Sequence, residues 1–178
     1  METRTAKIIS SSAGGTAGKN AVTYKISLPT AWINELGIDK ANREVELHFD
    51  GQTISISKKQ TADAYVSSHK QLGHCLKKYS FYDKEKLCTV IYVDHTDKSV
   101  FAENFTDNLV KTAFGRNTFP TWENFCDFIE ERCVPKGRSG LREYIESIGL
   151  YEYDPFEIIL KTKGRMAEDS QWIEVEEI

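Results

Sequence analysis

The stretch AGGTAGKN at residues 13–20 contains the residue types that a phosphate-binding loop needs. Its glycines would let backbone N–H groups approach an anion, and Lys19 would add a positive charge. A P-loop also requires a hydroxyl residue after the lysine, to hold Mg²⁺, and a helix whose N-terminus faces the phosphates. Here Asn20 replaces that hydroxyl, and the residues that follow alternate as in a β-strand. Both requirements fail, so the sequence argues against nucleotide hydrolysis.

The four histidines are the next candidates for chemistry, and they are His48, His69, His74 and His95. None has a carboxylate or cysteine partner at the spacing of a metal motif, although Cys75 directly follows His74. The sequence contains no HExxH or GxSxG pattern and no recognisable Cys/His dyad. We therefore expect structural or solvated histidines, with no catalytic residues, no metal and no cofactor, in a protein that is not an enzyme.

The net charge of −4 at pH 7 hides an uneven distribution of charge along the chain. Residues 1–59 contain eight Lys/Arg and six Asp/Glu, a balance of +2, whereas residues 60–178 contain 15 and 21, a balance of −6. Residues 1–30 hold four basic residues and a single acid, Glu2. A nucleic-acid binder needs only a local basic surface. This distribution of charge therefore predicts that any contact with DNA is made by residues 1–59.

Hydrophobic periodicity predicts the elements that would carry this basic surface. Residues 22–28 (VTYKISL) alternate apolar and polar side chains, as in a half-buried strand. Pro29 ends that strand and can open a helix of one or two turns, and Gly37 suits the left-handed cap that closes a helix. The alternating segments 45–49 and 54–56 flank an Asp-Gly dipeptide, which is a strong signal for a β-hairpin.

The run ISLP…W…LGI, followed by VELHFDGQTISI, resembles the AbrB/MazE/SpoVT family of swapped-hairpin DNA-binding domains over about residues 4–59, roughly a third of the chain. That family builds its fold from two chains, so the resemblance implies a homodimer whose hairpins interlock in a shared β-barrel. A segment of this size with short strands also buries little apolar surface alone. The alternative is a generic β-hairpin with a short helix.

The same resemblance implies a set of DNA-contacting residues. Lys25 matches best, because it lies four residues before the strand-ending proline, where AbrB-like proteins carry a DNA-contacting arginine. The remaining candidates would supply positive charge or neutral hydrogen bonds to phosphates, and they are Lys19, Lys7, Arg4, Asn20, Thr23 and Ser12. Some family members also place arginines in the helix after the proline, and TAWIN has none here. Lys25 could reach guanine acceptors in the major groove, but phosphate neutralisation is the contact that we expect.

Beyond residue 59 we expect two further regions, giving an α+β protein overall. Residues 60–115 predict a connecting helix and a short hairpin formed by LCTVIYVD (87–94) and KSVFAENF (98–105). Residues 116–178 predict a mainly α-helical C-terminal domain with helices starting near Thr121, Ser139 and Pro155, and then an acidic tail. This region is similar to a domain of uncharacterised Firmicutes and mobile-element proteins and, more loosely, to a segment of HipA-like proteins, which implies no particular chemistry.

The first two helices of this C-terminal region also have features of a helix-turn-helix. Four basic residues gather near their turn, namely Arg132, Lys136, Arg138 and Arg142, but Glu143 and Glu146 on the second helix would face DNA poorly. The connection is also longer than the usual 3–4 residues. A protein-binding or core-forming helix pair is therefore favoured.

Together these patterns predict a homodimeric DNA-binding transcriptional regulator or antitoxin-like protein, with double-stranded DNA and a protein as partners. The alternative is a protein-interaction or inhibitor protein that neutralises a toxin or host enzyme and uses the first module only to dimerise. No apolar run approaches the ~18 residues of a membrane span, and the N-terminus lacks the apolar core of a signal peptide. We therefore expect no membrane contact and a cytoplasmic location.

Overall fold

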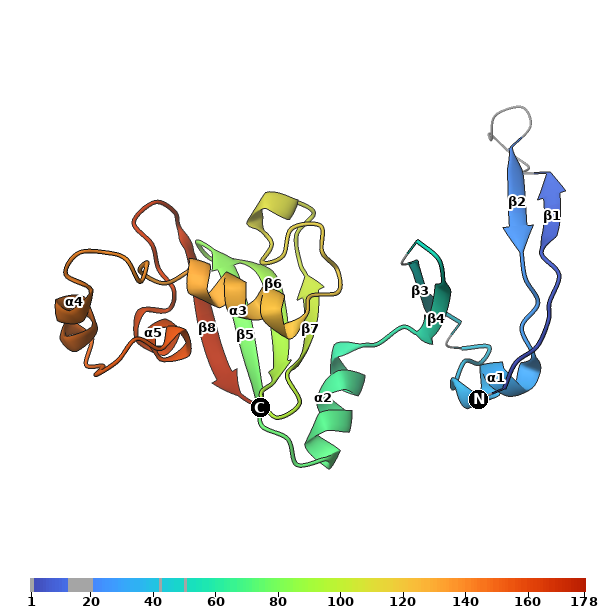
Figure 1. Ribbon diagram of the computed structural model, residues 1–178, viewed down its shortest axis with the longest axis horizontal. Helices are drawn as coiled ribbons and strands as arrows, with labels where there is room; N and C mark the ends of the chain where they lie inside the picture. The colour runs from blue at the N-terminus through green and yellow to red at the C-terminus, as the bar shows by residue number, and fades with distance from the viewer. Residues whose placement is uncertain (1, 13–20, 42, 50) are drawn as a thin grey trace. The chain divides into compact units, whose positions relative to one another are not determined.

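A computed structural model of the chain describes residues 2–12, 21–41, 43–49 and 51–178 (Figure 1). The chain divides into two compact units, residues 1–59 and residues 60–178. Both contain helices and strands, so the α+β class is confirmed. Within the described parts of the chain, no helix is both long and apolar enough to cross a bilayer, which takes about 20 residues.

The N-terminal unit consists of two antiparallel hairpins and a short helix. Its elements are β1 (Ile9–Ser12), β2 (Val22–Lys25), α1 (Thr30–Glu35), β3 (Val45–Phe49) and β4 (Ile54–Lys58). Helix α1 begins directly after Pro29, and Gly37 follows it with a φ of 64°, the left-handed conformation that suits a helix end. The strand, helix and hairpin predicted for this region are confirmed. Among the described residues the hairpins form two separate two-stranded sheets, without a closed barrel.

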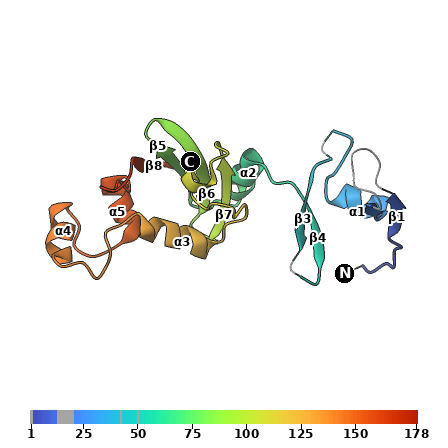
Figure 2. The same cartoon turned by 90° about the horizontal axis from the view of Figure 1, so that it is seen from above.

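The C-terminal unit is built on one antiparallel sheet with the strand order β7-β6-β5-β8. Its strands are β5 (Leu76–Asp83), β6 (Lys86–Asp94), β7 (Ser99–Asn104) and β8 (Gln171–Glu177). Its helices are α2 (Ala62–Gln71), the 3-10 helix η1 (Leu109–Lys111), α3 (Trp122–Glu131), α4 (Leu141–Ser147) and α5 (Pro155–Thr162). Figure 2 shows α3 and α5 on one side of the sheet. The predicted β6–β7 hairpin and the three helices after residue 120 are confirmed.

Side-chain caps fix the starts of the two helices that cover the sheet. At α3, the Thr121 hydroxyl accepts a hydrogen bond from the backbone N–H of Asn124, and the Asn124 side chain accepts one from the N–H of Thr121. At α5, the Asp154 carboxylate accepts from the N–H of Phe156, and Pro155 occupies the first turn. Such caps pair N–H groups that a helix start otherwise leaves unsatisfied.

The hydrophobic core lies between the sheet and these two helices. Edge-to-face ring pairs join the two layers, with centroid distances of 4.9 Å for Tyr79 and Phe125 and 5.2 Å for Phe81 and Phe128. The other fully or nearly fully buried side chains of this core include Cys88, Ile91, Val93, Ile129, Ile145, Ile158, Ile159 and Ile173. Each such aliphatic or aromatic side chain contributes on the order of 1.5–3 kcal/mol when it leaves water.

The sequence predicts a separate helical domain over residues 116–178, and the position of β8 corrects this prediction. This strand pairs with β5 along its whole length, so residues 60–178 form one unit with no boundary near residue 115. Ile173 and Val175 alternate with glutamates and face the core, which is the period-two pattern of a strand. The glutamates are held by β5: Lys78 Nζ lies 2.7 Å from the carboxylate of Glu176. Residues 60–84 likewise contain β5 as well as the expected helix.

Arg132, at the C-terminal end of α3, connects that helix to the segment that leads into β8. Its guanidinium is buried and donates to the carbonyl of Gly164 (2.8 Å), the carbonyl of Gln171 (2.9 Å) and the Asp169 carboxylate (3.1 Å). Gly164 has a φ of 58°, and a Cβ there would lie 2.9 Å from a side-chain carbon of Ile159. Arg132 is therefore a structural residue, which removes one of the basic side chains of the helix-turn-helix alternative.

Arg132→Ala should lower the free energy of unfolding of the C-terminal unit by about 3 kcal/mol, because it leaves Asp169 and two backbone carbonyls without their buried donor. Chemical denaturation measures this change. Arg142→Ala is the matched control: Arg142 forms an exposed pair with Glu146, and its loss should stay within about 0.5 kcal/mol. Equal effects of the two substitutions would contradict the role of Arg132.

Stability should also fall in acid through Asp169. The hydrogen bond from Arg132 holds the pKa of the Asp169 carboxyl below its usual value, against the opposite effect of partial burial. A carboxyl with a lowered pKa in the folded state stabilises the fold above its ordinary pKa of about 3.9, and that contribution is lost as the pH falls through the lowered value. When the pH falls below about 4, the free energy of unfolding measured in urea should decrease less for Asp169→Asn than for the wild type. Equal decreases in the two proteins would refute the role of Asp169 in the loss of stability in acid.

Candidate functional site

The hairpin formed by β1 and β2 holds three of the residues that the sequence nominated for DNA contact. Its register pairs Ile9 with Lys25 and Ser11 with Thr23, and directly opposite residues of an antiparallel pair share a face. Lys25 and Thr23 therefore project from the same face of the hairpin, and both are exposed. Ser12 pairs with Val22 and lies on the other face, so the structure separates it from Lys25.

The remaining nominated residues are distributed differently. Lys7 is exposed and precedes β1, and neither Lys7 nor Lys25 forms an ion pair with another described residue. Arg4 lies 5.8 Å from the centre of the Trp32 ring, a cation–π contact that places it against α1. Lys19 and Asn20 lie outside the described residues.

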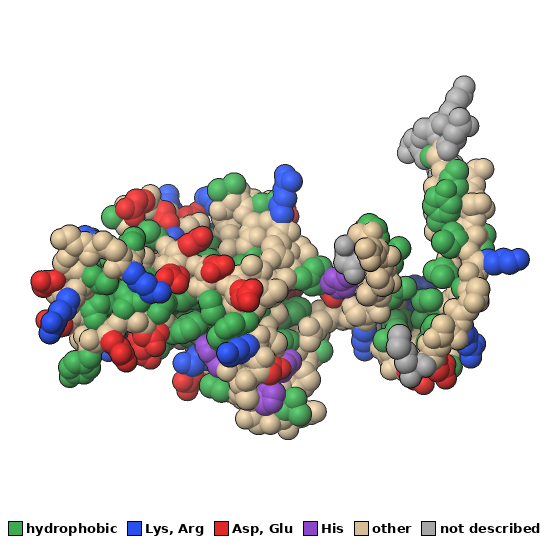
Figure 3. All heavy atoms as spheres, viewed as in Figure 1, with side chains coloured by type: hydrophobic (Ala, Val, Ile, Leu, Met, Phe, Trp, Pro, Cys, Tyr) green, Lys and Arg blue, Asp and Glu red, His purple; other side chains and the backbone are tan. Residues whose placement is uncertain are grey.

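The N-terminal unit leaves most of its apolar side chains exposed to solvent. Leu47 is 65 % exposed and Phe49 is 70 % exposed, and the β3–β4 register places both on one face with Ile54 and Ile56. Figure 3 shows hydrophobic side chains along the N-terminal strands. Among the described residues of this unit, Ile38 is the one hydrophobic residue that is buried. Since soluble monomers seldom present such large apolar patches, this unit lacks a sufficient core of its own.

A second group of chemically competent side chains lies in the C-terminal unit, where α2 packs against the turn between β6 and β7. His69 Nε2 is 3.8 Å from a carboxylate oxygen of Asp94 and 3.5 Å from one of Asp97. His74 Nδ1 donates to the same oxygen of Asp94 at 2.6 Å. Ser99 Oγ lies 3.3 Å from His69 Nε2. We refer to His69, His74, Asp94 and Asp97 as the His–Asp cluster.

Asp94 is the central residue of the His–Asp cluster, and its side chain is fully buried. Burial opposes ionisation of this carboxyl, but hydrogen bonds from His74 and from the backbone N–H groups of Thr96 and Asp97 outweigh it and lower the pKa of Asp94. The group is therefore a buried carboxylate held ionised at neutral pH. Such an environment is common at functional sites as well as in structural networks.

Ser99 and His69 do not extend into a hydrolytic triad. In such a triad a carboxylate orients the histidine through its second ring nitrogen. His69 Nδ1 instead lies 2.7 Å from the backbone carbonyl of Tyr65, and Asp94 is hydrogen-bonded to His74. The arrangement has the donor atoms of a metal site or an ion-pair network, and it lacks the order of a nucleophile, a base and an orienting acid.

Sequence spacing missed the His–Asp cluster because its members come from distant segments. His69 lies on α2, whereas Asp94 ends β6 and Asp97 follows in the turn. The packing of α2 on the sheet brings them together, with Tyr65 stacked on Phe101 of β7 and its hydroxyl 2.8 Å from Ser99 Oγ. One local signal was available: Asp94 closes the nearly continuous apolar run LCTVIYVD, where a buried carboxylate needs partners.

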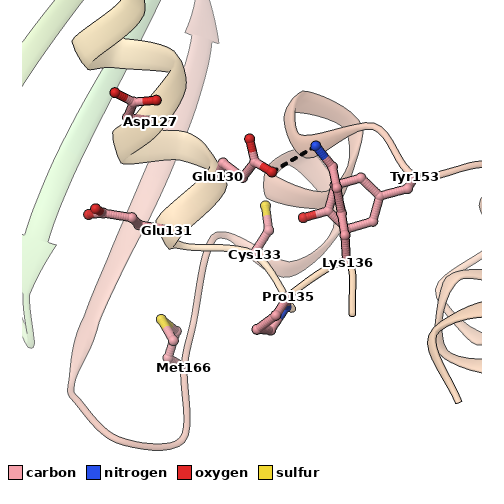
Figure 4. Close-up of a pocket in the computed structure, with 8 residues that line it drawn as sticks. All are labelled: Asp127, Glu130, Glu131, Cys133, Pro135, Lys136, Tyr153 and Met166. Atoms are coloured by element: carbon pink, nitrogen blue, oxygen red, sulfur yellow. Dashed lines mark ion pairs between the residues drawn. The ribbon is translucent and has the colours of Figure 1, made fainter. Parts of the chain in front are cut away.

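An open hollow of about 470 Å³ lies beside the C-terminal end of α3 (Figure 4). Three of the lining side chains are acidic, namely Asp127, Glu130 and Glu131, and Lys136 pairs with Glu130 at 2.7 Å. Cys133 also lines it, but burial raises the pKa of this thiol to about 12, so it is not a reactive nucleophile at neutral pH. Acidic side chains therefore predominate among the charged residues that line the hollow.

Neither the hairpin surface nor the His–Asp cluster can be assigned by similarity to known proteins. No protein-family model matches the chain, and no curated protein and no solved structure matches it. The resemblance of residues 4–59 to AbrB-like domains therefore stays a prediction, and function must be inferred from the residues and their geometry.

Proposed function

We propose that this chain is a homodimeric DNA-binding regulator or antitoxin-like protein. In this proposal the N-terminal unit dimerises and contacts duplex DNA, and the C-terminal unit binds a protein partner. The observation that supports it best is the contrast within the N-terminal unit: exposed apolar side chains that need a cover, and an exposed hairpin face that carries Lys25 and Thr23.

A second copy of the chain is the partner that best suits the exposed apolar side chains. Leu47, Phe49 and Ile54 would each contribute on the order of 1.5–3 kcal/mol on burial, and among the described residues this unit has little buried core of its own to stabilise it. In a two-fold dimer both copies contribute the same surface patch to the interface. The apolar patch of one copy would therefore be covered by the apolar patch of the other. The interlocked hairpins of AbrB-like domains are one way to achieve this.

The face of β1–β2 that carries Lys25 suits a polyanion. Lys25 is exposed and has no ion-pair partner among the described residues, so its charge is available to phosphates. Thr23 on the same face can donate a neutral hydrogen bond to a phosphate oxygen. The charge of −6 over residues 60–178 would disfavour contact of the C-terminal unit with DNA. The N-terminal unit is thus the better candidate for the interface.

The acidic hollow beside α3 favours the second candidate, an interaction protein that uses the N-terminal unit only to dimerise. Asp127, Glu130 and Glu131 would attract a basic surface of a protein partner. Both candidates require a dimer, and they differ in whether duplex DNA binds through Lys25.

Wild-type protein at micromolar concentration should sediment as a dimer, and Leu47→Lys should weaken that dimer at least tenfold, because each subunit would bury a charge in an apolar interface. Leu72→Lys is the matched control, since Leu72 is 68 % exposed but belongs to the C-terminal unit. Sedimentation equilibrium provides the measurement. A monomeric wild type, or equal behaviour of the two variants, would refute the proposed interface.

Lys25→Ala should weaken binding to duplex DNA and flatten its dependence on salt. Each lost phosphate contact removes about 0.9 from the slope of log K against log salt, so a dimer should lose roughly 1.8. Lys161→Ala on α5 removes the same charge from an exposed position of the C-terminal unit and should leave the slope unchanged. If the wild-type protein dimerises but shows no measurable DNA binding, the result would favour the second candidate function, an interaction protein.

A further inference from the structure

We propose that His69, Asp94 and Asp97 form a binding site for a divalent transition-metal ion of the Zn²⁺ class. Each side chain offers one ligand atom, and the three atoms lie within 4.8 Å of one another. The distances from His69 Nε2 to the carboxylate oxygens are 3.5 and 3.8 Å. Ligands of a tetrahedral zinc site are roughly 3.3 Å apart, given bonds of about 2.0–2.2 Å, so the two His69 distances need only a small contraction, and the two carboxylate oxygens would close from a separation of at most 4.8 Å.

The orientation of His69 turns the correct nitrogen toward the aspartates, and a bound metal would replace the contact of Ser99 Oγ with that nitrogen at 3.3 Å. Its Nδ1 lies 2.7 Å from the backbone carbonyl of Tyr65, and a carbonyl can only accept a hydrogen bond. Nδ1 therefore carries the hydrogen in the neutral ring, and the lone pair resides on Nε2, which faces the two aspartates. A hydrogen bond from the second ring nitrogen to a carbonyl is the usual way in which proteins orient a metal-binding histidine.

Each aspartate is oriented in a comparable way. Oδ1 of Asp94 accepts from the backbone N–H groups of Thr96 (2.7 Å) and Asp97 (3.2 Å), and Oδ1 of Asp97 accepts from the N–H of Ser99 (3.0 Å). In both residues Oδ2 is the oxygen near His69. His74 donates to Oδ2 of Asp94 and so supports the ligand from outside the site. All three ligands are thus preorganised by groups that do not themselves ligate.

Charge and burial also suit a cation. The two carboxylates carry −2 when His69 is neutral, which one divalent ion would balance. The side chain of Asp94 is fully buried and that of His69 is 14 % exposed, whereas that of Asp97 is 42 % exposed and leaves an entry path from solvent. An imidazole with two carboxylates favours Zn²⁺ and related ions over Mg²⁺, which prefers oxygen ligands and retains its waters.

The competing explanation is an ion-pair network in which a protonated His69 contacts both aspartates without a metal. The two explanations differ in one measurable property, because the network has no affinity for zinc. Asp97→Asn is the informative variant: it removes one ligand oxygen charge at a partly exposed position and keeps the side-chain shape. Asp107→Asn is the matched control, since Asp107 is exposed, belongs to the same unit and lies outside the His–Asp cluster.

The experiment is titration calorimetry of the full chain with ZnCl₂ after removal of metals by a chelator. Wild type and Asp107→Asn should bind one ion per chain with equal affinity, Asp97→Asn should bind at least ~10-fold more weakly, and MgCl₂ should not compete. The proposal is overturned if the wild type binds no zinc, or if Asp97→Asn binds as the wild type does, because the metal then lies elsewhere.

A second readout keeps the test independent of folding defects. Without zinc, Asp97→Asn and the wild type should melt at similar temperatures, and zinc should raise the melting temperature of the wild type more than that of the variant. If Asp97→Asn does not fold, His69→Gln takes its place with the same expected loss of affinity. None of these measurements depends on DNA binding or dimerisation, so a failure here leaves the proposed function to its own tests.

Discussion

The constraint that governs this protein is the exposed apolar surface of its N-terminal unit. Leu47, Phe49 and Ile54 lie on one face of a two-stranded sheet that the described residues of the same unit do not cover. A two-stranded hairpin is at best marginally stable in water, and uncovered apolar strands promote association. Our account of the dimer, and of the basic face that the dimer would present, depends on a second copy that satisfies this constraint.

The C-terminal unit covers the apolar side chains of its core within a single chain. It buries a continuous core between a four-stranded sheet and helices α3 and α5, and β8 returns from the end of the chain to complete the sheet. Arg132 ties α3 to the turn before β8 through the carbonyls of Gly164 and Gln171. A unit with a core of its own can present the His–Asp cluster and the acidic hollow without help from a partner.

Local signals explain what could be predicted from the sequence. Pro29 and Gly37 bound a short helix, Thr121 and Asp154 cap helices, and alternation marks the paired strands, because each of these effects acts within a few residues. The pairing of β8 with β5 joins segments about 90 residues apart, so no local signal predicts it, although the alternation of Ile173 and Val175 with glutamates is the period-two pattern of a strand. The His–Asp cluster was missed for the same reason, since His69 and Asp94 meet only after α2 packs on the sheet. For the DNA surface, the sequence nominated both Lys25 and Ser12, and the register puts them on opposite faces of the hairpin.

The central claim is that two copies share the N-terminal unit, and hydrogen exchange at several protein concentrations tests it most directly. Amides of β3 and β4 should become more protected as the concentration rises, because dimerisation covers the strands, whereas amides of β5 and β6 should show protection that does not depend on concentration. Protection of β3 and β4 that stays constant from dilute to concentrated solution would show that a single chain stabilises this unit and would contradict the account.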